Sequence, residues 1–235
     1  MQPTFNPWIG YFDLIDYVDQ FVFLDIVQLN QQSWQTRNKI KIKNNELMFS
    51  LPIQKTKLKD ELLIKDTLLD FRKFDFRKKL LKTLEQNYKK SKYFISIHPI
   101  IADIVMYETP YLSNYNINII KTIIEKLNIS TKTTVVSQTS YEPALSKGEL
   151  VLDICKYFGS NDYISPLGSK DYLENTSSSF RDSKVNITYQ YYKHSTYTQL
   201  GDDFIPYIGI FDLLYNEGIE NSLNIIRRGR TYENR

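Results

Sequence analysis

Apolar residues recur with two different periods along this chain, and each period predicts one kind of element. Over residues 7–19 they lie three or four positions apart, which predicts a helix. The run 21–27, apolar except for Asp25, is typical of a strand buried on both faces. The same patterns predict further helices over 76–90, 117–127, 148–157, 206–216 and 219–227, and further strands over 40–43, 47–53, 133–138, 162–165 and 186–192.

Strands that alternate with helices favour an α/β fold with a mixed, partly parallel sheet flanked by helices. A Rossmann-like arrangement of the N-terminal half is one version of it. Asn44-Asn45 is a natural hairpin turn, residues 54–74 suit a long surface excursion, and residues 175–179 suit a polar loop. No long linker and no fixed-period repeat divides the chain, so we expect one domain over residues 1–235.

Composition excludes several classes of protein. The formal net charge is only +3 and acids and bases are mixed, so we expect no nucleic-acid partner; the densest basic stretch, residues 79–92, suits a solvated helix face. The single cysteine, Cys155, cannot form an internal disulfide or a cysteine-based zinc site. No apolar run approaches the roughly 18 residues of a membrane span, and the start lacks a signal-peptide pattern. These features predict a cytoplasmic protein.

Residues 1–43 combine hydrogen-bonding side chains with Trp, Tyr and Phe more densely than a core needs. A buried polar group must find a partner, so cores prefer side chains without polar atoms. Small-molecule sites, in contrast, combine aromatic walls with a few polar groups. We therefore expect the functional site to include this stretch.

The chain resembles the WbqC-like proteins, which occur in bacterial O-antigen and other surface-polysaccharide gene clusters. The resemblance is carried by Gln2-Pro3, Pro7-Trp8, Gly10–Phe12, Asp25, Val27-Gln28, Trp34, Arg37-Asn38, Asp153–Cys155, Asp162–Ile164, Leu167-Gly168, Tyr192, His194, Tyr197, Gln199, Phe204, Pro206 and Ile210–Leu214. It implies a transferase that attaches an amino acid, with glycine as the proposed case, to an amino sugar. Family members usually have a short apolar strand before the Gln-Pro pair, so that strand either precedes Met1 or is missing.

Two residues are candidates for proton transfer. His194 follows the strand predicted over 186–192, and its side chain titrates near neutral pH, which suits an acceptor of an amine proton. Asp25 lies where the strand Phe21–Leu24 ends within the apolar run 21–27, and ligands of open α/β sheets bind at the carboxyl ends of strands. The alternatives are a structural histidine bonded to backbone, as we expect for His98, and an aspartate that caps a turn.

Other side chains suit substrate binding. Arg37 offers a planar fork to a carboxylate or phosphate, or else forms a surface ion pair. Asn6 can cap a helix that has Pro7 in its first turn, and such a helix start favours an anion. Trp34 can stack on a sugar or a base, or belong to the core. The expected substrate-binding residues are Gln2, Pro7, Trp8, Tyr11, Gln28, Trp34, Arg37, Asn38, Tyr197 and Gln199.

Two segments are similar to each other: Pro7–Ile15 and Pro206–Leu214 share Pro-x-Ile-Gly-x-Phe-Asp-Leu. They either face each other across a site or simply open two amphipathic helices. Cys155 is either a nucleophile that holds an acyl group or a buried helix residue. Motifs of P-loop NTPases, zincins and α/β-hydrolases do not occur, and residues 7–11 lack the histidines of the nucleotidylyltransferase turn Pro-x-His-x-Gly-His.

These features lead to one hypothesis and two alternatives. The hypothesis is a transferase that joins an activated aminoacyl (glycyl) or acyl group to the amine of a nucleotide-linked amino sugar. We expect no bound cofactor and no metal, and a donor made by another enzyme and carried by an acyl or peptidyl carrier protein. The alternatives are a non-catalytic nucleotide-sugar-binding or scaffold protein and a diverged nucleotidyltransferase; the oligomeric state stays open.

Overall fold

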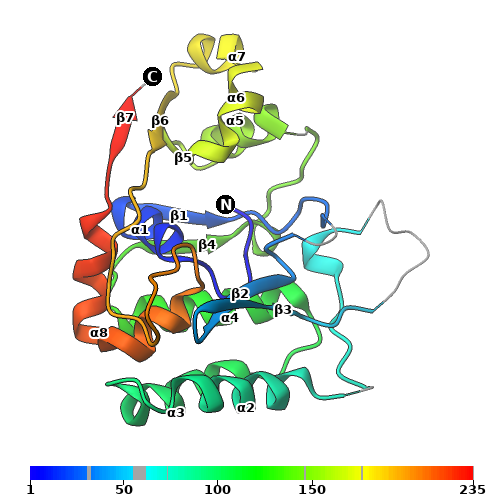
Figure 1. Cartoon of the computed structure of the whole chain (residues 1–235). Coiled ribbons are helices and arrows are strands. Elements are labelled where there is room, and N and C mark those ends of the chain that lie inside the picture. Colours follow the sequence, from blue (N-terminus) through cyan, green and yellow to red (C-terminus); the bar gives the residue numbers. More distant parts are fainter. Residues whose placement is uncertain (31–32, 55–61, 73, 146, 176, 235) are drawn as a thin grey trace.

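The structure is a computed structural model that describes residues 1–30, 33–54, 62–72, 74–145, 147–175 and 177–234 (Figure 1). Its α-helices are α1 (Ile9–Tyr17), α2 (Phe76–Tyr88), α3 (Phe94–Val105), α4 (Leu112–Lys126), α5 (Lys147–Tyr157), α6 (Lys170–Asn175), α7 (Ser177–Asp182) and α8 (Ile210–Arg228). Its strands are β1 (Gln20–Phe23), β2 (Arg37–Ile42), β3 (Asn45–Ser50), β4 (Lys132–Val135), β5 (Asp162–Pro166), β6 (Asn186–Gln190) and β7 (Tyr232–Asn234).

The strands confirm a mixed, partly parallel α/β fold. Strand β1 pairs with β4 in parallel, β5 pairs with β6 in parallel, and β7 joins β6 antiparallel. Strands β2 and β3 form the predicted antiparallel hairpin. The described strands belong to three small sheets rather than to one. Strands of three to six residues bury little surface, so helices supply most of the core.

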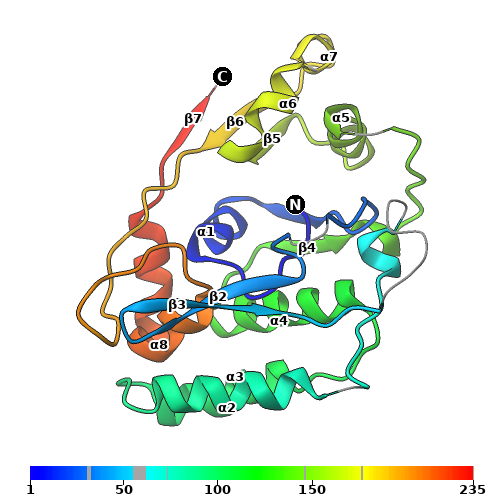
Figure 2. The ribbon, with the colours of Figure 1, turned by 45° about the vertical axis from the view of Figure 1, so that its right-hand side comes forward.

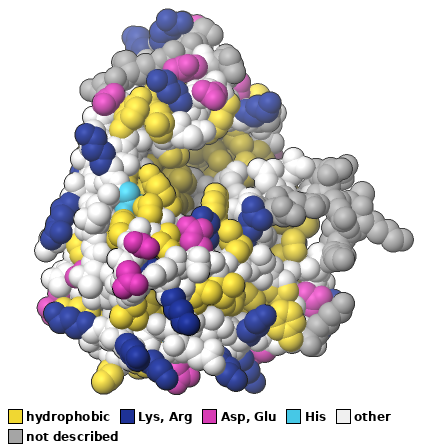
Figure 3. Space-filling model, in the orientation of Figure 1, with side chains coloured by type: hydrophobic (Ala, Val, Ile, Leu, Met, Phe, Trp, Pro, Cys, Tyr) yellow, Lys and Arg dark blue, Asp and Glu magenta, His cyan; other side chains and the backbone are white. Residues whose placement is uncertain are grey.

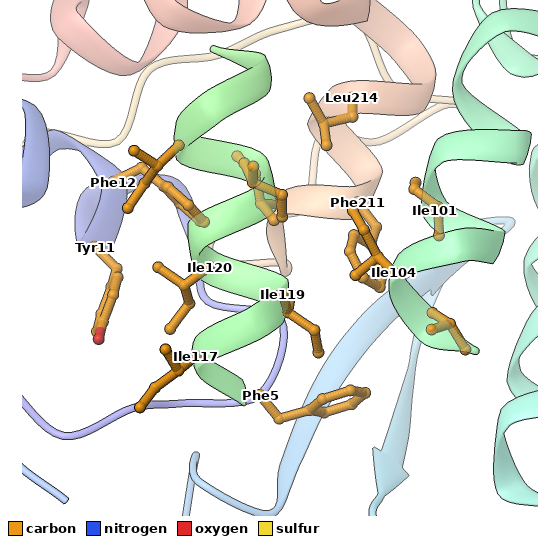
Figure 4. Close-up of a cluster of buried hydrophobic side chains, with 14 of the residues drawn as sticks. Phe5, Tyr11, Phe12, Ile101, Ile104, Ile117, Ile119, Ile120, Phe211 and Leu214 are labelled. Carbon is orange, nitrogen blue, oxygen red and sulfur yellow. The ribbon is translucent and has the colours of Figure 1, made fainter. Parts of the chain in front are cut away.

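The main core surrounds α4. Figure 4 shows its isoleucines, among them Ile119 and Ile120, between the side chains of α1, α3 and α8, while Phe5 of the N-terminal segment packs near its start. These side chains are almost fully buried. The apolar face of α4 is therefore buried against three other helices, while its polar positions, such as Lys121 and Glu125, stay exposed.

A smaller core lies under α5–α7, against β5 and β6. It contains Cys155, Leu173 and Phe180, all buried. Figures 1 and 2 show these elements as a lobe above the main body, with α2 and α3 on the opposite side. Figure 3 shows the face between lobe and body hollowed, with hydrophobic side chains inside the hollow.

Several elements differ from the sequence-based expectation. Helix α3 was not predicted, because Pro99 interrupts its pattern of helix-forming residues. The polar loop expected at 175–179 is wrong: α6 and α7 cover most of it, and the buried ring of Phe180 fixes α7 to the small core. The two helices expected near the C-terminus adjoin at Gly218, whose φ of 70° breaks the regular helix, and together form α8. The excursion at 54–74 lies partly outside the described residues.

In the described part of the chain, no helix has both the length and the apolar character that a membrane crossing requires.

Candidate functional site

The N-terminal segment before α1 is held by polar contacts to its backbone. Asn6 has a left-handed conformation, with a φ of 45°. The buried amide of Asn38 donates to the carbonyl oxygens of Phe5 (2.9 Å) and Asn6 (2.7 Å). The Asn38 side chain therefore fixes the backbone of residues 5 and 6 through two buried hydrogen bonds.

Asn6 was expected to cap the helix that follows it, and that expectation is wrong. Helix α1 begins at Ile9, and its N-cap position is Trp8, which makes no capping side-chain bond. The Asn6 side chain instead accepts a hydrogen bond from the N–H of Phe211 in the first turn of α8 (3.2 Å). The Asn6 side chain therefore contacts the start of α8 rather than that of α1.

The two similar segments of the sequence lie directly against each other. Trp8 and Gly209 form an antiparallel bridge, and the N–H of Ile210 donates to the carbonyl oxygen of Pro7 (2.8 Å). A Cβ atom at Gly209 would lie 2.1 Å from the Asn6 amide, so only glycine permits this approach. The starts of α1 and α8 therefore form one unit.

Aromatic rings surround His194 beside this unit. The ring centroid of Trp8 lies 6.0 Å from that of His194, with the rings stacked, and that of Tyr207 lies 5.1 Å away. Tyr197 and Phe204 lie at 6.3 and 5.6 Å. We call these four rings and the imidazole the His194 cluster; it joins the segment before α1 to residues 194–207.

The imidazole of His194 is held in one tautomer by a backbone carbonyl. Its Nδ1 lies 2.9 Å from the carbonyl oxygen of Ser195; because a carbonyl oxygen only accepts, Nδ1 carries the proton and Nε2 the lone pair. Nε2 is buried and has no hydrogen-bond partner among the described residues. Burial lowers the pKa of His194, so the imidazole is neutral at neutral pH.

Tyr197 and Gln199, both expected to bind substrate, contact a buried carboxylate. The Tyr197 hydroxyl and the Gln199 amide each donate to Oδ2 of Asp212 at 2.9 Å, and the Tyr88 hydroxyl donates to its Oδ1 at 2.8 Å. The Gln199 side chain also bonds both backbone groups of Ile205. Burial raises the pKa of Asp212. This network fixes the chain on both sides of the His194 cluster.

Asp13 occupies the corresponding position of the first segment and has a similar network. Its fully buried carboxylate accepts from Gln190 (2.9 Å), Tyr232 (2.8 Å) and Arg230 (2.7 Å). These contacts connect α1 to β6 and β7. Neither aspartate was among the expected site residues, although the repeated Phe-Asp-Leu was a signal for both.

A second polar group lies where the N-terminal segment meets α4. The Gln2 side chain accepts a hydrogen bond from the Gln35 amide, and Asn116 of α4 donates to the carbonyl oxygens of Pro3 (3.1 Å) and Gln35 (2.8 Å). The side-chain oxygens of Gln35 and Asn116 are buried without a partner among the described residues. Gln35 and Asn116 were not among the expected site residues, because neither lies in a recognisable motif.

Asp25 lies near this group but is enclosed. Its carboxylate accepts from the hydroxyls of Ser113 (3.2 Å) and Ser137 (2.5 Å) and from the N–H of Ser137 (3.1 Å), and the residue is 2% exposed. These contacts connect the end of β1 to α4 and to the turn after β4. They suit a structural carboxylate, and its role as a base stays a prediction.

The other expected binding residues have different surroundings. Tyr11 is a core residue whose hydroxyl donates to the carbonyl oxygen of Gln2, and Pro7 is buried. Trp34 is half exposed, and the exposed Gln28 pairs its backbone with Leu63. Arg37 is half-buried, and its Nε has no hydrogen-bond partner among the described residues.

The expected site residues thus form two groups along the N-terminal segment, one before Trp8 and one at Trp8. Asp25 belongs to neither group, because its carboxylate is enclosed by Ser113 and Ser137. Gln2 and Asn38 lie along the stretch before Trp8, whereas Trp8 itself contacts His194. Cys155 lies apart in the small core, where burial raises the pKa of its thiol to about 11, which favours the core interpretation over the nucleophile. Within the described residues, no group of three His, Cys, Asp or Glu side chains could hold a metal ion.

Comparisons with known proteins match nearly the whole chain to one protein family. The model of the WbqC-like protein family matches residues 2–223, from the N-terminal segment into α8. An uncharacterized protein of Mycobacterium tuberculosis (strain ATCC 25618 / H37Rv), Rv1507c, is 31% identical over 222 residues, which are 94% of this chain and 93% of that protein. No solved structure matches significantly. The chain belongs to the WbqC-like protein family.

Proposed function

We propose that this protein is an amide-forming transferase that joins an aminoacyl, specifically glycyl, or acyl group to the amine of a nucleotide-linked amino sugar for a surface polysaccharide such as O-antigen. The observation that carries the proposal is the neutral imidazole of His194, whose Nε2 lone pair has no partner among the described residues. A base of this kind is what an amine nucleophile requires.

The reaction balances with a thioester donor. The sugar amine attacks the thioester carbonyl carbon, a C–N bond forms, and His194 Nε2 takes the proton of the amine. The C–S bond then breaks, and the leaving thiolate receives that proton. The step needs no oxidant or reductant and no further energy source, because the thioester is already activated. A carrier protein charged by another enzyme would supply the thioester.

Two features support a nucleotide-linked substrate. The guanidinium of Arg37 is half-buried, its Nε lacks a described partner, and its planar fork suits a phosphate or carboxylate. The ring of Trp34, nearby in sequence, is 50% exposed and available for stacking. Nucleotide-linked sugars are made in the cytoplasm, so we propose that the protein acts there.

The test is product formation followed by mass spectrometry. The protein is incubated with uridine diphosphate–glucosamine and a glycyl or acetyl thioester of pantetheine, and the expected product is the N-acylated sugar nucleotide. His194→Gln should lower the rate by about 10²-fold or more. His98→Gln is the matched control, because His98 lies in α3, bonded to Tyr215, outside the His194 cluster.

Binding without turnover would contradict this proposal and favour the non-catalytic alternative. The aromatic rings of the His194 cluster suit that alternative too, because they can hold a sugar without reacting with it. Equal rates for wild-type protein and His194→Gln would contradict the role of His194 alone and leave Asp25 as the candidate base.

A further inference from the structure

The backbone at Tyr207 is strained. Its φ is 59°, in the left-handed region, which a residue with a large side chain rarely adopts. Three of the other left-handed residues occupy ordinary places for this conformation: Lys43 lies in the β2–β3 turn, and Asn128 and Lys184 follow the ends of α4 and α7. Asn6, in the segment before α1, and Lys147, the first residue of α5, are left-handed as well. Tyr207 lies at no hairpin turn and no helix end.

Anchors on the C-terminal side hold Tyr207 in this conformation. Ile208 is fully buried, Gly209 pairs with Trp8, and the N–H of Gly209 donates to the carbonyl oxygen of Lys39 (3.3 Å). Strained residues persist only where the surrounding structure determines them, and they concentrate at functional sites.

The strain places a large ring on the outside of the His194 cluster. The Tyr207 ring centroid lies 5.2 Å from that of Trp8 and 5.1 Å from that of His194, yet the residue is 54% exposed. Trp8 is only half-buried as well. A tyrosine needed for packing alone would be buried, and one needed for solubility alone would not require a left-handed backbone.

We propose that Tyr207, with Trp8, forms an aromatic wall that binds the hexose ring of the substrate next to His194. The inference rests on the proposed function, since it takes the sugar amine as the group that His194 deprotonates. That amine is attached directly to the sugar ring, so the ring must lie beside the imidazole. The nucleobase is separated from it by two phosphates and therefore binds elsewhere.

The wall selects a flat, mostly equatorial hexose face. Tyrosine and tryptophan offer large apolar surfaces that match the C–H groups on such a face, while the sugar hydroxyls remain free for polar groups. Tyr207 is thus a substrate-binding residue that determines specificity, and it takes no part in proton transfer.

The experiment separates the ring from the backbone strain. Dissociation constants for uridine diphosphate–glucosamine and for uridine diphosphate are measured by calorimetry, without donor, for wild type, Tyr207→Gly, Tyr207→Phe and Lys184→Gly. Glycine removes the left-handed strain at either position. Lys184, with a φ of 61°, is the matched control, because it follows α7 in the separate lobe.

The expected result is a weaker Kd for the amino-sugar nucleotide, by about tenfold or more, in Tyr207→Gly alone. Its Tm should stay near or above that of wild type, as for Lys184→Gly, so that the loss is not unfolding. Tyr207→Phe keeps the ring and should keep the Kd, and the affinity for uridine diphosphate should not change in any variant.

Each other outcome has a distinct meaning. If Tyr207→Gly binds the amino-sugar nucleotide as tightly as wild type does, Tyr207 is not part of a binding wall. If its affinity for uridine diphosphate falls by the same factor, Tyr207 does not bind the hexose ring specifically. A wild type that binds neither probe contradicts the wall and the proposed function together. Loss of binding in Tyr207→Gly, with no turnover by wild type on any thioester, supports the wall and contradicts the transferase reaction.

Discussion

Trp8 and Gly209 pair as an antiparallel bridge that joins the start of α1 to the start of α8. The bridge brings the tryptophan ring to one side of His194, while Tyr207, two residues before Gly209, occupies another side. Contacts between distant parts of the chain thus build the His194 cluster. A substitution on either segment should therefore affect both.

The pairing extends to two buried carboxylates. Asp13 and Asp212 have the same place in the repeated Pro-x-Ile-Gly-x-Phe-Asp-Leu, and each accepts from a glutamine amide and from at least one tyrosine hydroxyl. Asp13 also contacts the guanidinium of Arg230. Each buried carboxylate thus fixes its own helix start, α1 or α8, by accepting hydrogen bonds from glutamine and tyrosine side chains.

We predict that Asp212→Ala lowers the free energy of unfolding by about 3 kcal/mol, because the mutation leaves buried donors of Tyr88, Tyr197 and Gln199 without their acceptor. Urea denaturation measures this change. Glu220→Ala, an exposed carboxylate of the same helix, is the control and should change the stability by less than about 0.5 kcal/mol. Equal losses for the two variants would show that the network contributes nothing of its own.

Much of the fold could be predicted from the sequence. Apolar periods located α1, α2, α4 and α5, and Asn44 marked the β2–β3 turn. The incorrect predictions have physical causes. Helix α3 was not predicted because Pro99 lies inside it. Helix α7 was not predicted because its conformation depends on the burial of Phe180 in the small core, which no local sequence pattern indicates. The division of the strands into three sheets also depends on tertiary packing.

The sequence indicated several residues of the candidate site, but it did not indicate how they contact one another. His194 and Trp8 were both expected, and they are in contact. For Asn38 and Gln199, residue type suggested ligand binding, yet their amides bond the backbone of Phe5 and the carboxylate of Asp212. A sequence shows that a side chain can form hydrogen bonds, but its partner is decided only when distant segments meet.

Arg37 and Asn38 are neighbours in β2 that should respond differently to truncation. Arg37→Ala should raise KM for the sugar nucleotide by about tenfold with little change in stability, because its Nε has no described partner. Asn38→Ala should lower the free energy of unfolding by about 1–3 kcal/mol, since the carbonyl oxygens of Phe5 and Asn6 lose their donor. Kinetics and urea denaturation of both variants test this contrast, and a reversed pattern would contradict it.

Cys155 should be inert in the folded protein. It lies in the small core with a pKa raised to about 11, so very little thiolate exists at pH 8 and the sulfur is shielded. Labelling by a disulfide reagent should be slow for native protein and fast in urea, and Cys155→Ala should keep its transferase rate. Rapid native labelling together with complete inactivation would instead support a nucleophilic thiol.

The final prediction concerns pH and the base. Because burial lowers the pKa of His194, its neutral form predominates at all pH values above a midpoint that lies below the usual histidine value of about 6.5. If His194 takes the amine proton, kcat/KM should rise with pH through that midpoint and then level off. The same shift means that the unfolded chain binds more protons than the folded protein, so this residue's contribution to stability should decrease as pH falls below about 6.5.

The sugar amine must also be unprotonated, and its titration can give a similar step. Substitution separates the two sources: in His194→Gln the residual rate should lose the step that belongs to the imidazole, whereas a step of the amine would persist. Tyr207→Phe supplies a further check, because the phenyl ring keeps His194 buried, and its midpoint should match that of the wild type. A step that survives unchanged in His194→Gln would assign the titration to the substrate and remove His194 as the base.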